Sequence, residues 1–268
     1  MSNIHWAQQR IDEISNTLQA QGHNSLRKTD CTRLPDIYDP AFIRADVNLS
    51  EVATGLKEAM SGRLCLYGPP CTGKTAYARW LAEKLGMPLL VKRASDLMSM
   101  FVGENEKNIA AAFEEAQQDG SLLLIDEVDS FLSDRRGAKA RWEASLVNEL
   151  LTQMESFSGV FIASTNLMAG LDQAALRRFD LKVKFDFLKP EQACELLTRH
   201  SRHLEIEAPS AMHLSRISRM NNLTPGDFAS IVRQNRFRRI ISADDMLTAL
   251  EAECGIKEGG RSGIGFLN

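Results

Sequence analysis

Two glycines and a lysine stand at fixed spacing in the segment Gly68-Pro69-Pro70-Cys71-Thr72-Gly73-Lys74-Thr75, which fits the pattern G-x-x-x-x-G-K-[ST]. An apolar run at 64–67 precedes the segment, and a stretch with helical spacing starts at Ala76 directly after it. A strand, a loop and a helix in this order surround a phosphate with the N–H groups of the loop and the N-terminus of the helix. The segment therefore predicts a phosphate-binding loop within an α/β fold; the alternative is a glycine-rich turn without a ligand.

Short apolar runs alternate with amphipathic helical stretches through the middle of the chain. Such alternation predicts a mostly parallel sheet covered by helices. Together with the loop at 68–75, this arrangement is the one expected of a P-loop NTPase. One helix between two of these runs is marked by apolar residues on a single face, from Leu146 to Met154. The expected strands lie at 64–67, 89–91, 122–125, 160–163 and, by alternation, 181–185.

The character of the sequence changes after Pro190, where helical signals replace strand signals. Thr224 before Pro225 and Ser242 before Ala243 have the residue types of helix N-caps. At the other end, apolar residues recur at helical spacing from Ile4 to Leu18 and predict a helix that either clasps the next domain or docks a partner. We expect three parts: an N-terminal helix and linker at 1–45, a large α/β nucleotide-binding domain at 46–188 and a small all-helical lid at 189–268.

Composition narrows the class of protein further. The chain has 268 residues, 44% of them hydrophobic and 25% charged, which is typical of a globular protein and excludes collagen, disorder and a disulfide-stapled miniprotein. The net charge of −3 provides no overall positive field, so nucleic acid is an unlikely partner. Five scattered cysteines favour a reducing compartment, and we expect a cytoplasmic protein. Neither a secretory leader nor an apolar run of about 20 residues is present, so no membrane insertion is expected.

Five side chains predict a site for ATP, Mg²⁺ and the attacking water. Lys74 reaches the β- and γ-phosphate oxygens in such loops, and the Thr75 hydroxyl is a magnesium ligand. Asp126 and Glu127 follow a buried strand, and their opposite directions let Asp126 hold the magnesium while Glu127 activates or orients water. Asn166 follows the next strand and would hold the attacking water. The alternative for these polar residues is an ordinary turn or cap.

These motifs, in this order, resemble the protein-remodelling branch of the AAA+ ATPases from about residue 46 to the C-terminus, and specifically a bacterial-type chain with a single AAA domain. The 68–75 loop is similar to the family's Walker A, the stretch 122–127 to its Walker B and Asn166 to its sensor 1. Arg177 and Arg178 lie in a stretch similar to its arginine-finger segment, although the segment is shorter than usual and leaves open which arginine is the finger. Gly226 lies in the stretch 224–228, which looks like the start of the family's sensor-2 helix. The resemblance implies ATP between the subunits of a homo-oligomer, commonly a hexamer.

A second set of residues resembles the family's first pore loop, whose aromatic side chain grips a polypeptide. It comprises Met100, Phe101, Val102 and Gly103. The resemblance implies a protein client that is threaded or remodelled through a central pore; the alternative is that Phe101 packs into its own domain. The polar stretch 134–141 is either a second mobile loop or an exposed connection.

Two features point elsewhere. Cys71 stands where the family has a glycine, at a position that often needs φ > 0. A residue other than glycine in that conformation costs about 1 kcal/mol or more. This departure leaves open a second function, an ATP-switched scaffold without useful turnover. A basic cluster supports the other alternative, a nucleic-acid-associated ATPase that acts as a loader or regulator. The cluster consists of Arg233, Arg236, Arg238 and Arg239.

Overall fold

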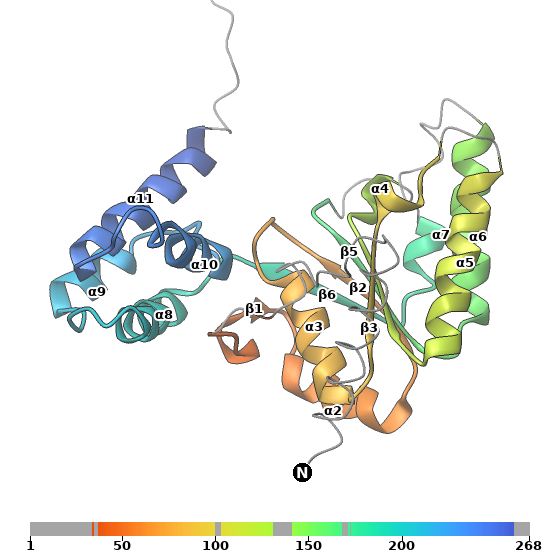
Figure 1. Cartoon of the computed structure of the whole chain (residues 1–268), viewed down its shortest axis with the longest axis horizontal. Coiled ribbons are helices and arrows are strands. Elements are labelled where there is room, and N and C mark those ends of the chain that lie inside the picture. The colour runs from red at the N-terminus through yellow and green to blue at the C-terminus, as the bar shows by residue number, and fades with distance from the viewer. Residues whose placement is uncertain are drawn as a thin grey trace, which may run out of the picture. The chain divides into compact units, whose positions relative to one another are not determined.

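The computed structural model describes residues 34, 37–99, 103–130, 141–167, 171 and 173–259. Its centre is a six-stranded sheet in the order β1-β6-β2-β5-β4-β3 (Figure 1). All neighbouring strands are parallel except β1 and β6, which are antiparallel. The predicted α/β fold is therefore confirmed. The strands are β1 (Arg44–Ala45), β2 (Gly62–Tyr67), β3 (Leu89–Arg93), β4 (Leu122–Asp126), β5 (Val160–Thr165) and β6 (Leu181–Asp186).

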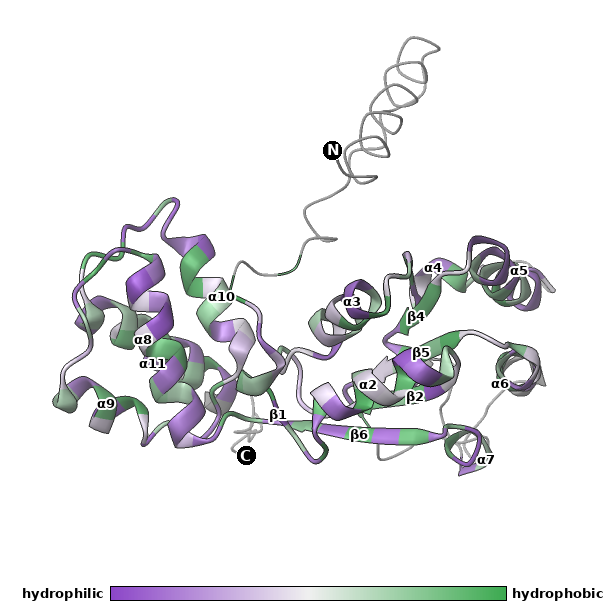
Figure 2. Ribbon diagram, turned by 90° about the horizontal axis from the view of Figure 1, so that it is seen from below, coloured by the Kyte–Doolittle hydropathy of each residue, from purple (hydrophilic) through white to green (hydrophobic). Residues whose placement is uncertain are grey.

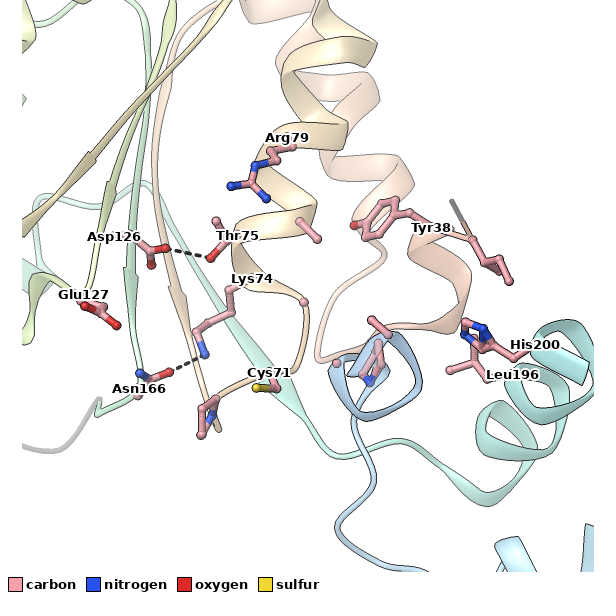
Figure 3. Close-up of a pocket in the computed structure, with 17 residues that line it drawn as sticks. Tyr38, Cys71, Lys74, Thr75, Arg79, Asp126, Glu127, Asn166, Leu196 and His200 are labelled. Atoms are coloured by element: carbon pink, nitrogen blue, oxygen red, sulfur yellow. Dashed lines mark hydrogen bonds between the residues drawn. The ribbon is translucent and has the colours of Figure 1, made fainter. Parts of the chain in front are cut away.

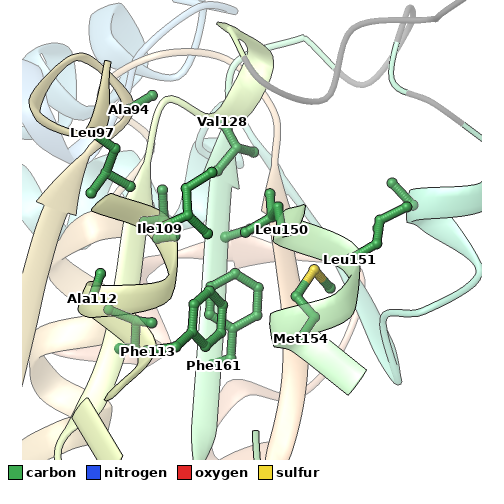
Figure 4. Packing of buried hydrophobic residues seen from close by; sticks show 14 of the residues in the cluster. Ala94, Leu97, Ile109, Ala112, Phe113, Val128, Leu150, Leu151, Met154 and Phe161 are labelled. Carbon is green, nitrogen blue, oxygen red and sulfur yellow. The ribbon is translucent and has the colours of Figure 1, made fainter. Parts of the chain in front are cut away.

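Helices cover both faces of this sheet, because the central strands carry apolar side chains on both sides. Leu123 and Phe161 are buried in one cluster, whereas their neighbours Leu124 and Ile162 are buried in the other. Figure 4 shows the first cluster, in which Phe113 and Phe161 lie side by side; their ring centroids are 5.2 Å apart. The first cluster takes residues from α4 (Ala94–Leu97), α5 (Glu104–Asp119), α6 (Arg141–Ser156) and α7 (Gln173–Leu176), and the second from α2 (Leu49–Ala59) and α3 (Lys74–Leu85).

The segment before β2 contains structure that local patterns did not predict. A short 3-10 helix, η2 (Pro40–Phe42), is capped by the Asp39 side chain, and β1 then pairs with β6. A two-residue edge strand is defined by a partner far along the chain, so periodicity cannot reveal it. A second 3-10 helix, η3 (Val128–Ser130), follows β4.

Beyond β6 the described residues form helices and no strand, as the sequence predicted. Thr224 is the N-cap of α10 with Pro225 at its first position, which confirms that expectation. These helices bury their apolar faces against one another in a third cluster, centred on Leu197, Phe228 and Leu250. Figure 2 shows hydrophobic and hydrophilic residues alternating along their ribbons. The helices are α8 (Pro190–His203), α9 (Ala211–Ile217), α10 (Pro225–Gln234) and α11 (Ala243–Gly259).

Some expectations fall outside the described residues. They include the N-terminal helix at 4–18, the loop at 134–140 and three residues of the pore-loop motif, Met100, Phe101 and Val102. Within the described part of the chain, none of the helices has the length and hydrophobicity that a membrane span requires.

Candidate nucleotide site

The 68–75 loop has the backbone that a phosphate-binding loop requires. Gly68 has φ 138°, and a Cβ there would lie 2.0 Å from the Phe185 carbonyl oxygen, so only glycine fits. Gly73 has φ 101° and is the N-cap of α3. Cys71 has φ 62°, as the sequence led us to expect, so a cysteine occupies a conformation that favours glycine. The loop therefore keeps its shape despite the substitution.

Lys74 lies at the centre of the loop and is 7% exposed. Its Nζ donates to the carbonyl oxygens of Gly68 and Pro69, both at 2.8 Å, and to Oδ1 of Asn166 at 2.9 Å. Burial lowers the pKa of Lys74 to about 8, although nearby Asp126 opposes the shift. The ammonium group of Lys74 thus links the phosphate-binding loop to Asn166 directly after β5. Its three acceptors are neutral oxygens, so a negatively charged phosphate could attract it away from them.

Two oxygen ligands lie together next to this lysine. The Thr75 hydroxyl donates to Oδ2 of Asp126 at 2.9 Å, and the hydroxyl of Ser164 on β5 donates to the other oxygen, Oδ1. A hydroxyl and a carboxylate are the hard donors that Mg²⁺ prefers, and Mg²⁺ usually takes one or two protein ligands plus phosphates and waters. The residues present therefore fit a magnesium ion. Among the described residues no cluster of three or more His, Cys, Asp or Glu forms a metal cage.

Glu127 and Asn166 lie across the pocket from α3. Glu127 has φ 61° and follows the last residue of β4, so a left-handed turn rather than the strand pleat separates it from Asp126. Asp126 and Glu127 line the same pocket, and the strand alternation expected for this pair does not describe the turn at Glu127. Figure 3 shows Glu127, Asn166 and Lys74 facing one another around the same space.

A pocket of about 420 Å³ connects these groups with elements outside the motifs. Thr72 points elsewhere, since it is 1% exposed and its hydroxyl donates to the Pro69 carbonyl oxygen at 2.8 Å. The predicted site residues that line the pocket are Pro70, Cys71, Gly73, Lys74, Thr75, Ala76, Asp126, Glu127, Asn166 and Gly226; further lining residues are Ile37, Tyr38, Arg79, Leu196, His200, Pro225 and Ala229.

Three of the further lining residues carry buried polar atoms without a hydrogen-bond partner among the described residues. They are the Tyr38 hydroxyl, Nε of Arg79 and Nδ1 of His200 (Figure 3). His200 is 6% exposed and stacks on Phe228 with ring centroids 5.2 Å apart. Burial, and then the nearby His203, lower the pKa of His200 to about 4, so the ring is neutral at pH 7. Burial also raises the pKa of the Tyr38 hydroxyl.

Sequence reasoning missed these residues because none belongs to a motif. Tyr38 comes from the segment before η2, and His200 lies in α8, far along the chain. One signal was present: Arg79 is four residues after Thr75 and hence on the same side of α3. Unpartnered polar atoms beside the apolar side chains of Ile37 and Leu196 are suited to a flat heteroaromatic ring with ring nitrogens.

The two arginines of the predicted finger segment differ. Arg178 pairs with Glu155 of α6 and also donates to the Ala174 carbonyl oxygen at 3.0 Å. Arg177 is exposed, and its guanidinium forms no ion pair with any described residue. Neither lines the pocket. Of the pore-loop motif, Gly103 alone is described; it has φ 84° and is the N-cap of α5.

Comparisons with known proteins agree with this geometry. Residues 64–187 match the model of the "ATPase family associated with various cellular activities (AAA)". Spastin from Drosophila persimilis is 36% identical over 184 residues, which are 66% of this chain and 23% of that protein. Spastin from Drosophila melanogaster is 39% identical over 155 residues, 55% of this chain and 20% of that protein. The matched region thus spans less than a quarter of these relatives, and their insect origin gives the expected bacterial-type chain no support.

Proposed function

We propose that residues 64–187, which match the AAA family model, act as an ATPase domain, in agreement with the enzyme class predicted from the sequence, and that this chain is an ATP-driven motor that remodels or unfolds a protein partner. The observation that carries the proposal is the convergence of Lys74, Asp126, Glu127 and Asn166 on one pocket. The helices after β6 supply the other wall through Leu196, His200 and Gly226. We place the protein in the cytoplasm, where scattered cysteines persist in the reduced form.

The loop would bind ATP by exchanging internal contacts for phosphate contacts. Lys74 would turn from the loop carbonyls to the β- and γ-phosphate oxygens, with the amides of the loop completing the cradle. Thr75 and Asp126 would hold Mg²⁺, which neutralises charge that develops on the phosphates. Tyr38 and His200 would contact the base at the other end of the pocket.

Glu127 would then act on water. As an exposed carboxylate beside the pocket it can accept a proton from a water molecule aimed at the γ-phosphate. Asn166 already contacts Lys74, so its amide would hold that water once the ammonium has moved to the phosphates. The new O–P bond forms as the bond to the β-phosphate breaks, which yields ADP and phosphate.

A neighbouring copy would complete the site. The transition state spreads negative charge over the γ-phosphate oxygens, and an arginine from another subunit typically contributes about 10³–10⁵ in rate. We assign this role to Arg177, since Arg178 is held by Glu155 in its own chain. In a homo-oligomeric ring, most simply a hexamer, Phe101 and its neighbours would grip the client in the central pore.

The test uses a Glu127→Gln variant, which should bind Mg-ATP and hold its client without releasing it. Pull-down followed by mass spectrometry should recover a protein with Glu127→Gln in the presence of ATP, but not with a Lys74→Ala variant, which lacks the phosphate contact. A Phe101→Ala variant that processes the recovered protein at wild-type speed would refute threading. Arg177→Ala should abolish turnover of the assembled protein, whereas Arg178→Ala should retain most of it.

One observation favours the nucleic-acid alternative. Phe237 is 83% exposed and is flanked by arginines that form no ion pair with the described residues. Binding of single-stranded DNA at rising salt separates the two functions, because contacts with several phosphates give a steep loss of affinity. Flat or absent binding supports the protein remodeller. The arginines are Arg233, Arg236, Arg238 and Arg239.

A further inference from the structure

The segment 222–227, called the turn below, comprises the residues before α10 and the first three residues of that helix, and it touches the phosphate-binding loop directly. The Gly226 N–H donates to the Cys71 carbonyl oxygen at 3.0 Å. The approach is so close that a Cβ on Gly226 would lie 2.6 Å from the Cβ of Cys71. Gly226 and its neighbour Pro225 also line the nucleotide pocket. The position of this turn therefore sets one wall of the pocket.

A buried carboxylate organises the turn from inside. Asp227 is 4% exposed, and its Oδ2 accepts hydrogen bonds from the Thr224 N–H at 2.8 Å and from the Thr224 hydroxyl at 2.9 Å. A negative side chain near the start of α10 is also favoured by the helix dipole. A buried charge nevertheless needs an opposite charge close by, because leaving it unpaired is costly.

Lys257 supplies that charge from the last turn of α11. Its Nζ lies 2.5 Å from Oδ2 of Asp227 and donates to the Asn222 carbonyl oxygen at 3.0 Å, so it holds both ends of the turn. Asn222 in turn donates to the Cys254 carbonyl oxygen at 3.1 Å. Among the described residues, Lys257 is the basic side chain that pairs with Asp227.

We propose that Lys257 is a positioning residue for the nucleotide site: through Asp227 it holds Gly226 against Cys71 and thereby sets the affinity for nucleotide. This inference rests on the proposed function, since it assumes that the pocket binds ATP. Lys257 lines no part of the pocket, so it acts only through the turn. Without its ammonium group, the turn would relax so that Asp227 can reach water, and the wall formed by Gly226 would move with it.

The first experiment measures Mg-ATP and Mg-ADP binding to the full chain by calorimetry. Lys257→Met should weaken both by about tenfold, in the range of couplings between linked sites, with kcat at saturating ATP nearly unchanged. Lys257→Arg should restore most of the affinity. The matched control is Glu251→Gln, which breaks another ion pair of α11, with Arg216 at 2.6 Å, and should leave the affinity unchanged. Equal affinity of Lys257→Met and wild type would overturn the proposal.

The second experiment needs no nucleotide. Hydrogen–deuterium exchange of the peptide that covers 222–228 reports the Gly226 N–H, which is protected by Cys71. Lys257→Met should accelerate this exchange several-fold while leaving β4 and β5 protected; unchanged exchange, or exchange that rises everywhere, would refute a local positioning role. If wild type bound no nucleotide but the exchange changed as expected, the proposed function would fail and the contact from Lys257 to the loop would stand.

Discussion

The two ends of the nucleotide pocket differ in how their polar groups are satisfied. At the phosphate end, Lys74 has three acceptors and Asp126 accepts from Thr75, so these groups hold one another in place. At the other end, polar atoms of Tyr38 and His200 are buried without a partner among the described residues. Unpaired buried polar atoms typically cost about 1–3 kcal/mol each. The phosphate end is therefore prearranged, whereas the other end has polar atoms that a bound ligand could satisfy.

This difference assigns different roles to the two ends of the pocket: catalysis to the phosphate end and binding of the base to the other end. Prearranged polar groups need little reorganisation when charge develops in the transition state, and this property favours catalysis. Buried polar atoms without a partner gain hydrogen bonds when a ligand binds, and this gain favours recognition of the base. Changes at the phosphate end should therefore affect turnover, and changes at the other end should affect affinity and stability.

The largest effect is expected from Glu127→Gln. Loss of the base at the phosphate end should lower the steady-state rate of ATP hydrolysis by about 10²–10⁴, because the amide cannot take a proton from water. Calorimetry should show the affinity for Mg-ATP within a few-fold of wild type. If both turnover and affinity fell together, Glu127 would be a binding residue, and the division between the two ends would fail.

Next in size is the pH dependence that His200 confers on stability. Its folded pKa of about 4 lies below its ordinary 6.5, so the unfolded chain binds the proton first as the pH falls. The contribution of neutral His200 to the free energy of unfolding is complete above pH 6.5 and is lost as the pH falls towards 4. Between pH 7.5 and pH 5 the loss amounts to about 2 kcal/mol. Urea unfolding of wild type and His200→Gln at several pH values measures this. The variant should lose that much less stability on acidification, and parallel curves would rule out a buried neutral His200.

Lys74 should make the affinity for Mg-ATP depend on pH, with a smaller effect that appears as the pH rises rather than as it falls. Its pKa of about 8 without nucleotide means that it loses its proton as the pH rises through 8, whereas bound phosphate favours the charged form. The affinity for Mg-ATP should therefore fall by up to about tenfold per pH unit above pH 8. Calorimetry in buffers of different ionisation enthalpy should show proton uptake on binding. Affinity that stays level from pH 7 to pH 9.5 would contradict this.

The smallest effect is expected at Cys71. Cys71→Gly removes a side chain from a left-handed conformation and should stabilise the fold by about 1 kcal/mol. Met60→Gly is a matched control, since Met60 has φ 51° at the end of α2 and does not line the pocket. Both variants should gain stability in urea unfolding, but only Cys71→Gly should change the affinity for nucleotide. A shift in affinity with Met60→Gly would mean that strain anywhere in the domain affects the site.

Local patterns predicted the strands and the phosphate loop because these depend on residues close in sequence. The run 122–125 lies within β4, and Thr224 before Pro225 starts α10 as expected. Local sequence patterns did not predict β1, because this strand of two residues is recognised by its pairing with β6, far along the chain. They also did not predict that Glu127 leaves the strand geometry of Asp126, since a φ of 61° is a property of the folded turn.

By itself, the sequence determined the α/β class, the phosphate loop, the two carboxylates at the end of β4 and the change to helices after Pro190. These features follow from spacing, from residue type and from the restricted backbone of glycine and proline, all of which act over short stretches of chain. The tertiary structure alone decided that Tyr38 and His200 line the same pocket as Lys74, that Arg178 pairs with Glu155, and that Lys257 reaches the turn beside Cys71. Each of these contacts joins residues far apart in the sequence, and such contacts arise only when the packed cores bring their elements together.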